Sequence, residues 1–282
     1  MAECGVCFRH CRIEDGGFGF CGARTAKDGA VVPYNYGRIT GIALDPIEKK
    51  PLNRFHPGSL ILSVGSFGCN LRCPFCQNSS ISWSEEALNL RDRTEYLSPE
   101  ELVDLAESMR DRGNTGIAFT YNEPLIGYEY VRDTARLAKE KGLMTVMVTN
   151  GTAELPVLDE LAPYIDAMNI DLKGFTESYY RDLLKGDLSQ VKAFIEEAVK
   201  HCHVELTTLI VPGENDTEEE MRELSMWADS LSNPDGEGVP LHITRFFPRF
   251  NMTDREPTDV RLVYRLAEIA RENVEYVYTG NC

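Results

Sequence analysis

Short apolar segments alternate with amphipathic segments along most of this sequence, and the alternation restricts the folds that the chain can adopt. We expect each apolar segment to be a buried strand; these segments are residues 59–66, 116–121, 144–150, 167–174, 203–212 and 240–248. We expect helices near residues 99–112, 127–141, 154–162, 187–201, 217–231 and 259–272. Apolar strands separated by such helices predict an α/β fold with a parallel sheet, here a partial (βα)6 TIM-type barrel.

The chain of 282 residues has room for one such barrel and a small additional module. We predict a cysteine-rich metal-binding module and its lead-in at residues 1–58, followed by the barrel at residues 59–282. The first barrel helix shows its own end signals: Ser98 suits the N-cap, and Glu101 completes a capping box.

Composition and charge narrow the classes of function. Hydrophobic residues make up 43% and charged residues 26%, as in an ordinary globular protein. The formal net charge of −16 disfavours a nucleic-acid partner, because phosphate binding needs clustered Lys and Arg. The sequence shows neither a secretory signal nor an apolar run that could span a membrane, so we expect a cytoplasmic protein. Its nine cysteines then favour metal binding over disulfides.

Three of these cysteines lie in the stretch "GSFGCNLRCPFCQN", directly after the first predicted strand. Cys69, Cys73 and Cys76 are separated by three and by two residues. Structural zinc normally takes four ligands, and catalytic zinc more often recruits His or carboxylate. Three thiolates fit a cluster of four irons in which one iron has no protein ligand and can bind a substrate. The alternative, cysteines in an apolar core turn, is disfavoured by the polar residues between them.

A second group of cysteines precedes the barrel, in "CGVCFRHCRIEDGGFGFCGAR". Cys4, Cys7, Cys11 and Cys21 supply enough ligands for a closed site, which suits zinc or an additional iron-sulfur cluster. The spacing does not choose between a structural metal and an electron relay.

Polar residues gather where the predicted strands end. The segments concerned are "TYNEP", "VTNG", "DLKG", "VPGEND" and "HITRFFP". Each alone is compatible with ordinary turn chemistry. In barrels of this kind the chemistry lies at the carboxyl ends of the strands, so we expect these segments to share one rim with the cysteine loop.

The cysteine loop, with Phe75 just before its last cysteine, resembles the signature of the radical S-adenosylmethionine (radical SAM) enzymes. The resemblance implies that a 4Fe-4S cluster on Cys69, Cys73 and Cys76 chelates S-adenosylmethionine through its open iron. An electron from the reduced cluster then cleaves the sulfonium and gives a 5′-deoxyadenosyl radical, which abstracts hydrogen from a substrate.

The same resemblance assigns further residues to S-adenosylmethionine. In "TYNEP", Asn122 and Glu123 occupy the place of the segment that binds the ammonium group. "VTNG" and "NIDLK" are similar to segments of pyruvate formate-lyase activating enzymes that approach the ligand's carboxylate and ribose. The cofactor-binding residues implied in this way are Phe75, Asn122, Glu123, Thr149, Asn150, Asp171, Lys173, Val211 and His242. For His242 a hydrogen-bonded structural histidine is an equal alternative.

The N-terminal module together with "DPIEKKPLNRFHPGS" resembles the radical enzyme of the AmmeMemoRadiSam system, a relative of those activating enzymes. This implies a reductant such as flavodoxin or ferredoxin, a protein substrate, and Memo-like and AMMECR1-like proteins as partners. Members of that family continue into a further cysteine-containing tail, whereas this chain stops at Cys282. We therefore expect either a truncated chain or a shorter branch.

The favoured function is a radical enzyme that acts on a protein or peptide, as glycyl-radical-activating enzymes do. An alternative keeps the radical chemistry but acts on a small molecule. A third is a non-enzymatic iron-sulfur electron carrier, which predicts fully ligated clusters and no affinity for S-adenosylmethionine.

Overall fold

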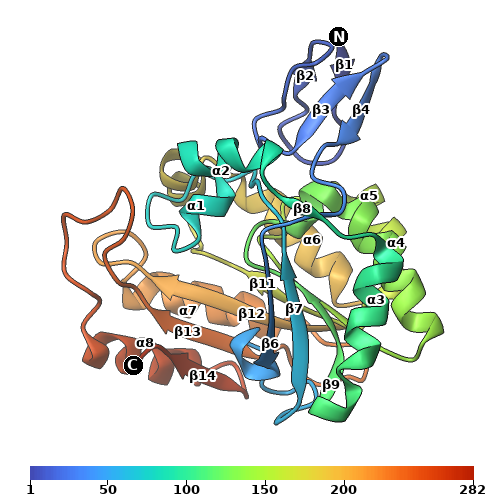
Figure 1. Cartoon of the computed structure of the whole chain (residues 1–282). Helices are drawn as coiled ribbons and strands as arrows, with labels where there is room; N and C mark the ends of the chain where they lie inside the picture. Colours follow the sequence, from blue (N-terminus) through green and yellow to red (C-terminus); the bar gives the residue numbers. More distant parts are fainter.

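The computed structural model describes residues 1–282, except for the side chain of Asp92. A twisted sheet forms the centre of the protein, and helices pack on its outer face (Figure 1). The N-terminal hairpins project above the sheet, near α2 (Glu85–Asn89).

All six predicted strands are present, and they pair in parallel in the order in which they follow along the chain. They are β7 (Leu60–Gly65), β9 (Asn114–Phe119), β10 (Met144–Thr149), β11 (Ala167–Asp171), β12 (His203–Ile210) and β13 (Leu241–Arg245). The α/β fold with a mostly parallel sheet is therefore confirmed. Parallel pairing brings the carboxyl ends of these strands to one rim.

Two further strands extend the sheet beyond the prediction. β6 (Gly41–Pro46) pairs antiparallel with β7, and β14 (Val277–Gly280) pairs in parallel with β13. Both are end strands of the sheet, and neither has the continuous apolar sequence that marks its interior. Because β6 lies within residues 1–58, that part of the chain contributes a strand to the sheet, and the predicted boundary at residue 58 stays a prediction.

The long helices fall where the sequence predicts them. They are α3 (Pro99–Ser108), α4 (Tyr128–Glu140), α5 (Leu155–Leu161), α6 (Leu188–Ala198), α7 (Glu218–Asp229) and α8 (Val260–Ala270). Ser98 caps α3, and its capping box with Glu101 is confirmed. Among the helices of the described chain, none is long and apolar enough to cross a membrane.

Shorter elements connect this framework. The N-terminal module contains the antiparallel pairs β1 (Ala2–Glu3) with β2 (Arg12–Ile13), and β3 (Arg24–Lys27) with β4 (Ala30–Pro33). The strand β5 (Arg38–Ile39) pairs with β8 (Glu95–Tyr96). The remaining elements are α1 (Ser79–Ser82), a π-helical turn (Tyr179–Leu184) and the 3-10 turns Ile47–Lys49, Leu90–Asp92, Arg110–Arg112, Pro124–Gly127 and Ala162–Tyr164.

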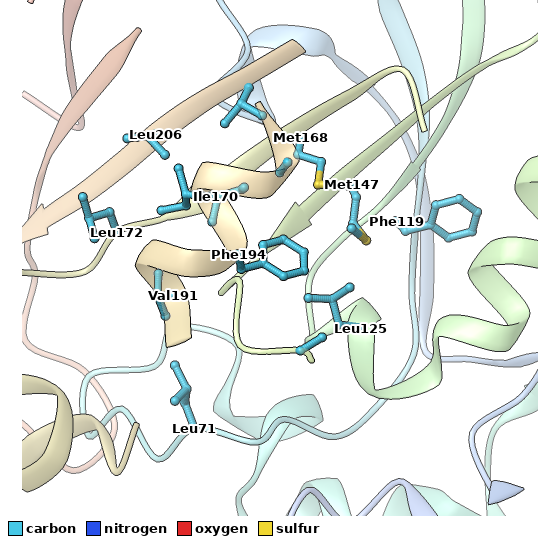
Figure 2. Packing of buried hydrophobic residues seen from close by; sticks show 14 of the residues in the cluster. Leu71, Phe119, Leu125, Met147, Met168, Ile170, Leu172, Val191, Phe194 and Leu206 are labelled. Atoms are coloured by element: carbon cyan, nitrogen blue, oxygen red, sulfur yellow. The ribbon is translucent and has the colours of Figure 1, made fainter. Parts of the chain in front are cut away.

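The largest apolar cluster lies between the sheet and the helices. Phe194 of α6 packs near Met168 and Ile170 of β11, and all three are fully buried (Figure 2). Leu71, from the cysteine loop, belongs to the same cluster. Burying an apolar side chain of this size contributes about 1.5–3 kcal/mol, so the loop is anchored by the core itself.

The segment that leads from β6 to β7 closes the amino end of the sheet. Ile47 and Leu52 pack in a second apolar cluster with Ile61, Ala118 and Val146. This segment forms a floor below the carboxyl rim.

The buried carboxylate of Glu205 fastens this floor to β12. It accepts hydrogen bonds from the backbone N–H groups of Asn53 (3.0 Å) and Arg54 (2.7 Å). The rings of His203 (3.0 Å) and His242 (2.6 Å) also contact it. Burial opposes ionisation of Glu205, but these partners outweigh it and lower the pKa of Glu205 to about 2.

We expect Glu205→Gln to lower the free energy of unfolding by about 3 kcal/mol at pH 7, since it removes a charge from a buried, paired network. The depressed pKa means that the stabilisation is present above the usual value of 4.5 and is lost as the pH falls towards about 2. The difference between variant and wild type should therefore shrink across that range, as measured by urea unfolding.

The matched control is Glu237→Gln, at a half-exposed ion pair with Arg54. It should change stability by no more than about 0.5 kcal/mol. A Glu205→Gln protein as stable as this control would contradict the proposed fastening of the floor.

Candidate active site

The cysteine loop leaves the carboxyl end of β7 in a tight turn. Gly68 has a φ of +95°, and a Cβ there would lie 2.7 Å from the Cβ of Ala23 and 2.8 Å from the carbonyl oxygen of Cys21. Only glycine meets both demands without strain. The N-terminal module therefore packs directly against the loop.

The three loop cysteines are free thiols, with Cys73 buried and the others half-buried. Burial raises the pKa of Cys73 to about 12 and the pKa of Cys69 as well. Within the described chain, no three His, Cys, Asp or Glu side chains gather closely enough to hold a single metal ion. Thiolates that each bind a different iron of a cluster do not need to meet at one point. Whether a cluster fits therefore depends on the residues around the loop.

Asn122 holds the start of the cysteine loop. Its Oδ1 accepts a hydrogen bond from the N–H of Ser66 (2.9 Å), and its Nδ2 donates to the carbonyl of Gly68 (3.2 Å). The side chain thus lies on the predicted rim, where it positions the loop. Its predicted contact with an ammonium group stays a prediction.

Glu123 lies in the loop that follows β9, and its buried carboxylate joins this loop to the end of β10. Oε1 accepts hydrogen bonds from Thr149 Oγ1 (2.6 Å) and the N–H of Leu125 (3.0 Å), while Oε2 accepts from the N–H of Asn150 (2.8 Å). Burial raises the pKa of Glu123 to about 7, although these donors oppose the shift. The sequence placed Glu123, Thr149 and Asn150 on one rim, and the structure brings them into direct contact.

Asn150 connects this network to the cluster loop. Its Nδ2 lies 3.8 Å from the sulfur of Cys69 and donates to Oδ1 of Asn70 at 3.0 Å. Asn70 in turn donates to the hydroxyl of Thr152 (2.7 Å). Asn70 and Thr152 were not predicted as site residues, although Asn70 stands inside the cysteine motif.

Asp171 is the last residue of β11, and Lys173 follows it; the two side chains form an ion pair of 2.8 Å. Burial alone would lower the pKa of Lys173, but the charges of Asp171 and Cys73 raise it above its usual value. Lys173 therefore stays a cation on the rim, close to the cysteine loop. A cation at this point suits the carboxylate of an amino-acid-like ligand.

Two tyrosines from the π-helical turn lie behind this ion pair. The hydroxyl of Tyr180 accepts a hydrogen bond from the backbone N–H of Lys173 (2.9 Å). The hydroxyl of Tyr179 is buried without a hydrogen-bond partner in the described structure, and Cys73 is among the groups that raise its pKa. A buried hydroxyl without a partner is rare in native proteins, and a group bound at the cysteine loop would explain it. Neither tyrosine was predicted as a site residue.

Three further predicted residues have partners of their own. Val211 is buried after β12, and its N–H donates to Asn215 Oδ1 (2.7 Å). Phe75 packs edge-to-face on Phe246, with ring centroids 6.2 Å apart. His242 lies early in β13 and contacts Glu205 in the floor network.

A further polar group, which the sequence analysis did not identify, connects Tyr121, two residues after β9, with β6 and with the floor segment. Tyr121, in the left-handed region at φ 72°, donates from its hydroxyl to Asp45 (2.8 Å). Lys50 pairs with the same carboxylate at 2.9 Å. Burial opposes ionisation of Asp45, but Lys50 and Tyr121 lower its pKa to about 2. Tyr121 belongs to the "TYNEP" segment, in which the sequence analysis predicted Asn122 and Glu123 as site residues but not Tyr121.

The N-terminal cysteines also lie together. Cys4, Cys7 and Cys21 are buried and Cys11 is half-buried. The N–H of Cys4 donates to the carbonyl of Cys11 (2.9 Å). Burial raises the pKa of Cys21 to about 11, and Cys7 and Cys4 add to this shift. The four cysteines thus lie near one another, and their role as ligands of a metal stays a prediction.

Comparison with known proteins identifies the class to which this site belongs. The family model of the Radical SAM superfamily matches residues 63–225, which include the cysteine loop. A relative named uncharacterized protein MJ0808, from Methanocaldococcus jannaschii, is 38% identical over 284 residues, covering 99% of this chain and 81% of the relative. Pyruvate formate-lyase 1-activating enzyme of Escherichia coli K12 is 27% identical over 179 residues, covering 62% of this chain and 71% of the relative.

Solved structures share the fold. Streptococcus suis SuiB superposes with a TM-score of 0.58 at 14% identity, over 77% of this chain and 48% of SuiB. A domain of pyruvate-formate lyase-activating enzyme from Bacteroides vulgatus gives 0.51 at 15% identity, over 60% of this chain and all of that domain. The chain belongs to the radical SAM superfamily, which implies a 4Fe-4S cluster and S-adenosylmethionine.

The residues present fit this cofactor pair. The cysteine motif carries free thiols at the rim, Lys173 supplies a cation beside them, and the hydroxyl of Tyr179 has no protein partner there. Cys69, Cys73 and Cys76 would hold the cluster.

We expect Glu123→Gln to lower the free energy of unfolding by about 1–3 kcal/mol, because the amide nitrogen would face a donor where the carboxylate oxygen accepts one. Urea unfolding of anaerobically prepared protein measures this. Glu160→Gln, at an exposed ion pair with Arg132, should remain within about 0.5 kcal/mol of wild type. Equal stability of the two variants would show that the Glu123 network does not support the rim.

Proposed function

We propose that this protein is a radical SAM enzyme that abstracts hydrogen from a protein or peptide, in the manner of a glycyl-radical-activating enzyme. The observation that carries the proposal is the three-cysteine loop at the carboxyl end of β7, which holds Cys69, Cys73 and Cys76 beside a rim of polar side chains. When bound there, the reduced cluster would supply the electron that splits S-adenosylmethionine into methionine and a 5′-deoxyadenosyl radical.

The chain's own residues bind and orient the cosubstrate. Lys173, kept charged by Asp171, is placed to pair with the carboxylate of S-adenosylmethionine. Asn122 binds the start of the cysteine loop and Glu123 binds the end of β10. We propose these two residues as partners of the ammonium group of S-adenosylmethionine. The other proposed contacts are Phe75, Thr149, Asn150 and Val211. His242 contacts Glu205 in the floor, and we propose it as the hydrogen-bonded structural histidine of the alternative prediction.

A macromolecular substrate is supported by sequence. The relative from Escherichia coli is named as the activating enzyme of pyruvate formate-lyase, which is itself a protein. The matched segment covers 62% of this chain. We therefore favour a protein or peptide over a small molecule.

A small-molecule substrate is the second candidate. A relative from Pseudomonas putida, 31% identical over 53% of this chain, is named GTP 3′,8-cyclase, and GTP is a small molecule. The matched segment covers 44% of this relative, so the match includes a smaller share of both chains than the match to the activating enzyme does. An electron carrier without S-adenosylmethionine is the third candidate. The unpartnered hydroxyl of Tyr179 and the charged Lys173 beside the cysteine loop count against it.

The proposed partners follow from the same family resemblance. They are a reductant such as flavodoxin or ferredoxin, a protein substrate, and Memo-like and AMMECR1-like proteins of the AmmeMemoRadiSam system. We also propose that Cys4, Cys7, Cys11 and Cys21 bind zinc or a second iron-sulfur cluster. The protein is proposed to act in the cytoplasm, where thiols stay reduced.

We expect Cys69→Ala, Cys73→Ala and Cys76→Ala each to abolish reductive cleavage of S-adenosylmethionine, because each thiolate holds a different iron. The measurement is 5′-deoxyadenosine released by anaerobically reconstituted protein with dithionite. Adding candidate protein or small-molecule substrates to the wild type then identifies the class that increases the yield.

The matched control is Cys282→Ala, which removes an exposed thiol that contacts the carbonyl of Gly280. This variant should release 5′-deoxyadenosine at the wild-type rate. Persistent cleavage in any variant of the cysteine loop would refute the assignment of the cluster.

A further inference from the structure

The two groups of cysteines, far apart in sequence, are joined by a direct backbone hydrogen bond. The N–H of Cys69 donates to the carbonyl of Cys21 at 3.2 Å. Gly68 lies against the same carbonyl, where a side chain could not fit. A continuous path of covalent bonds and one hydrogen bond therefore connects the sulfur of Cys21 with the sulfur of Cys69.

Side chains make a second connection. Asn150 bridges the sulfur of Cys69 and the Oδ1 of Asn70. Burial raises the pKa of Cys7, and the side chain of Asn70 is near enough to oppose that shift. The buried amides of Asn70 and Asn150 thus lie between a cysteine of the N-terminal group and a cysteine of the barrel loop. Asn70 stands between the two proposed metal centres.

Two arginines and a phenylalanine clamp the groups together. The ring of Phe20 lies between the guanidinium groups of Arg9 (3.5 Å) and Arg72 (3.7 Å). Arg9 donates to the carbonyl of Asn70 (2.8 Å), and Arg72 donates to the carbonyls of Cys69 (2.9 Å) and Phe20. Each guanidinium is electrostatically coupled to thiols of both cysteine groups. Positive charge placed in this way stabilises the reduced, more negative form of a nearby cluster.

The module that carries the N-terminal cysteines is fixed to the barrel on other sides as well. The N–H of Glu154 donates to the carbonyl of Val6 (2.9 Å). Arg24 makes a bidentate ion pair with Glu129 of α4 (2.7 and 2.9 Å). Rigid docking keeps the distance between the two centres constant, which a relay requires.

The N-terminal module also projects from the body of the protein (Figure 1). Cys4, Cys7 and Cys21 are buried, but their neighbour Phe20 is 38% exposed and Cys11 is half-buried. A protein reductant would therefore approach the module at Phe20 and Cys11.

We propose that Cys4, Cys7, Cys11 and Cys21 hold a second iron-sulfur cluster that passes electrons to the barrel cluster through the contact between Cys21 and Cys69. This inference rests on the proposed function, since the barrel cluster is its electron acceptor. Zinc in the same place would be redox-inert and could only support the fold.

The relay transfers one electron at a time. A protein reductant of the flavodoxin or ferredoxin class is oxidised by one electron and reduces the N-terminal cluster. That cluster is then oxidised by one electron and reduces the barrel cluster, so each cycle leaves the N-terminal cluster unchanged. The electron finally enters the sulfonium bond of S-adenosylmethionine.

The first test uses wild-type protein prepared anaerobically. We expect about eight irons per chain and no stoichiometric zinc, with about four irons left in the Cys69→Ala/Cys73→Ala/Cys76→Ala variant. This variant should keep a reduced-cluster electron paramagnetic resonance signal. In the wild type, coupling between the two reduced clusters should broaden the spectrum. A stoichiometric zinc ion, or a triple variant without iron, would overturn the proposal.

The second test separates the relay from the radical chemistry. In the Cys4→Ser/Cys7→Ser/Cys11→Ser/Cys21→Ser variant, reduction of the barrel cluster by reduced flavodoxin should slow at least about tenfold in stopped-flow absorbance. Cleavage of S-adenosylmethionine with dithionite should remain. Cys282→Ala should behave as wild type in both measurements.

An unchanged rate with flavodoxin would overturn the relay and leave the proposed function intact. Loss of cleavage by the wild type itself would instead refute the proposed function. If the serine variant does not fold, the metal content and spectra of the wild type and the barrel variant still decide the identity of the N-terminal centre.

Discussion

The rim depends on the hydrogen bonds that the buried carboxylate of Glu123 accepts. This carboxylate accepts hydrogen bonds from the N–H of Leu125 in the loop after β9, and from Thr149 and Asn150 at the end of β10. The backbone N–H of Glu123 donates to the carbonyl of Gly68. Burying a carboxylate is unfavourable, as its pKa of about 7 shows, but three donors offset much of that cost. The cysteine loop, Asn150 and the ends of two strands are thereby held in one arrangement.

The N-terminal module completes this arrangement. The turn at Gly68 packs against Ala23 and the carbonyl of Cys21, so the barrel loop adopts its path in contact with the module. The buried ion pair between Arg24 and Glu129 fixes the module to α4. The rim and the four cysteines of the module are therefore parts of one structural unit.

Much of this could be read from the sequence because it depends on local pattern. Continuous apolar runs identified the parallel strands, and the Ser98 capping box identified the start of α3. The end strands β6 and β14 were missed because they are short or of mixed polarity and gain their pairing from neighbours. The π-helical turn at Tyr179–Leu184 was not predicted, because six residues are too few to show a helical period in the sequence.

The sequence by itself determined the parallel sheet, the three-cysteine loop after its first parallel strand, and the family resemblance, since all three are written in spacings along the chain. Only the tertiary structure decided which side chains meet. It placed Glu123 against Asn150, His242 in the floor with Glu205, and Cys21 against Cys69. These pairs are separated by many residues in the sequence, and their contacts follow from how strands register and loops pack, which no local pattern encodes.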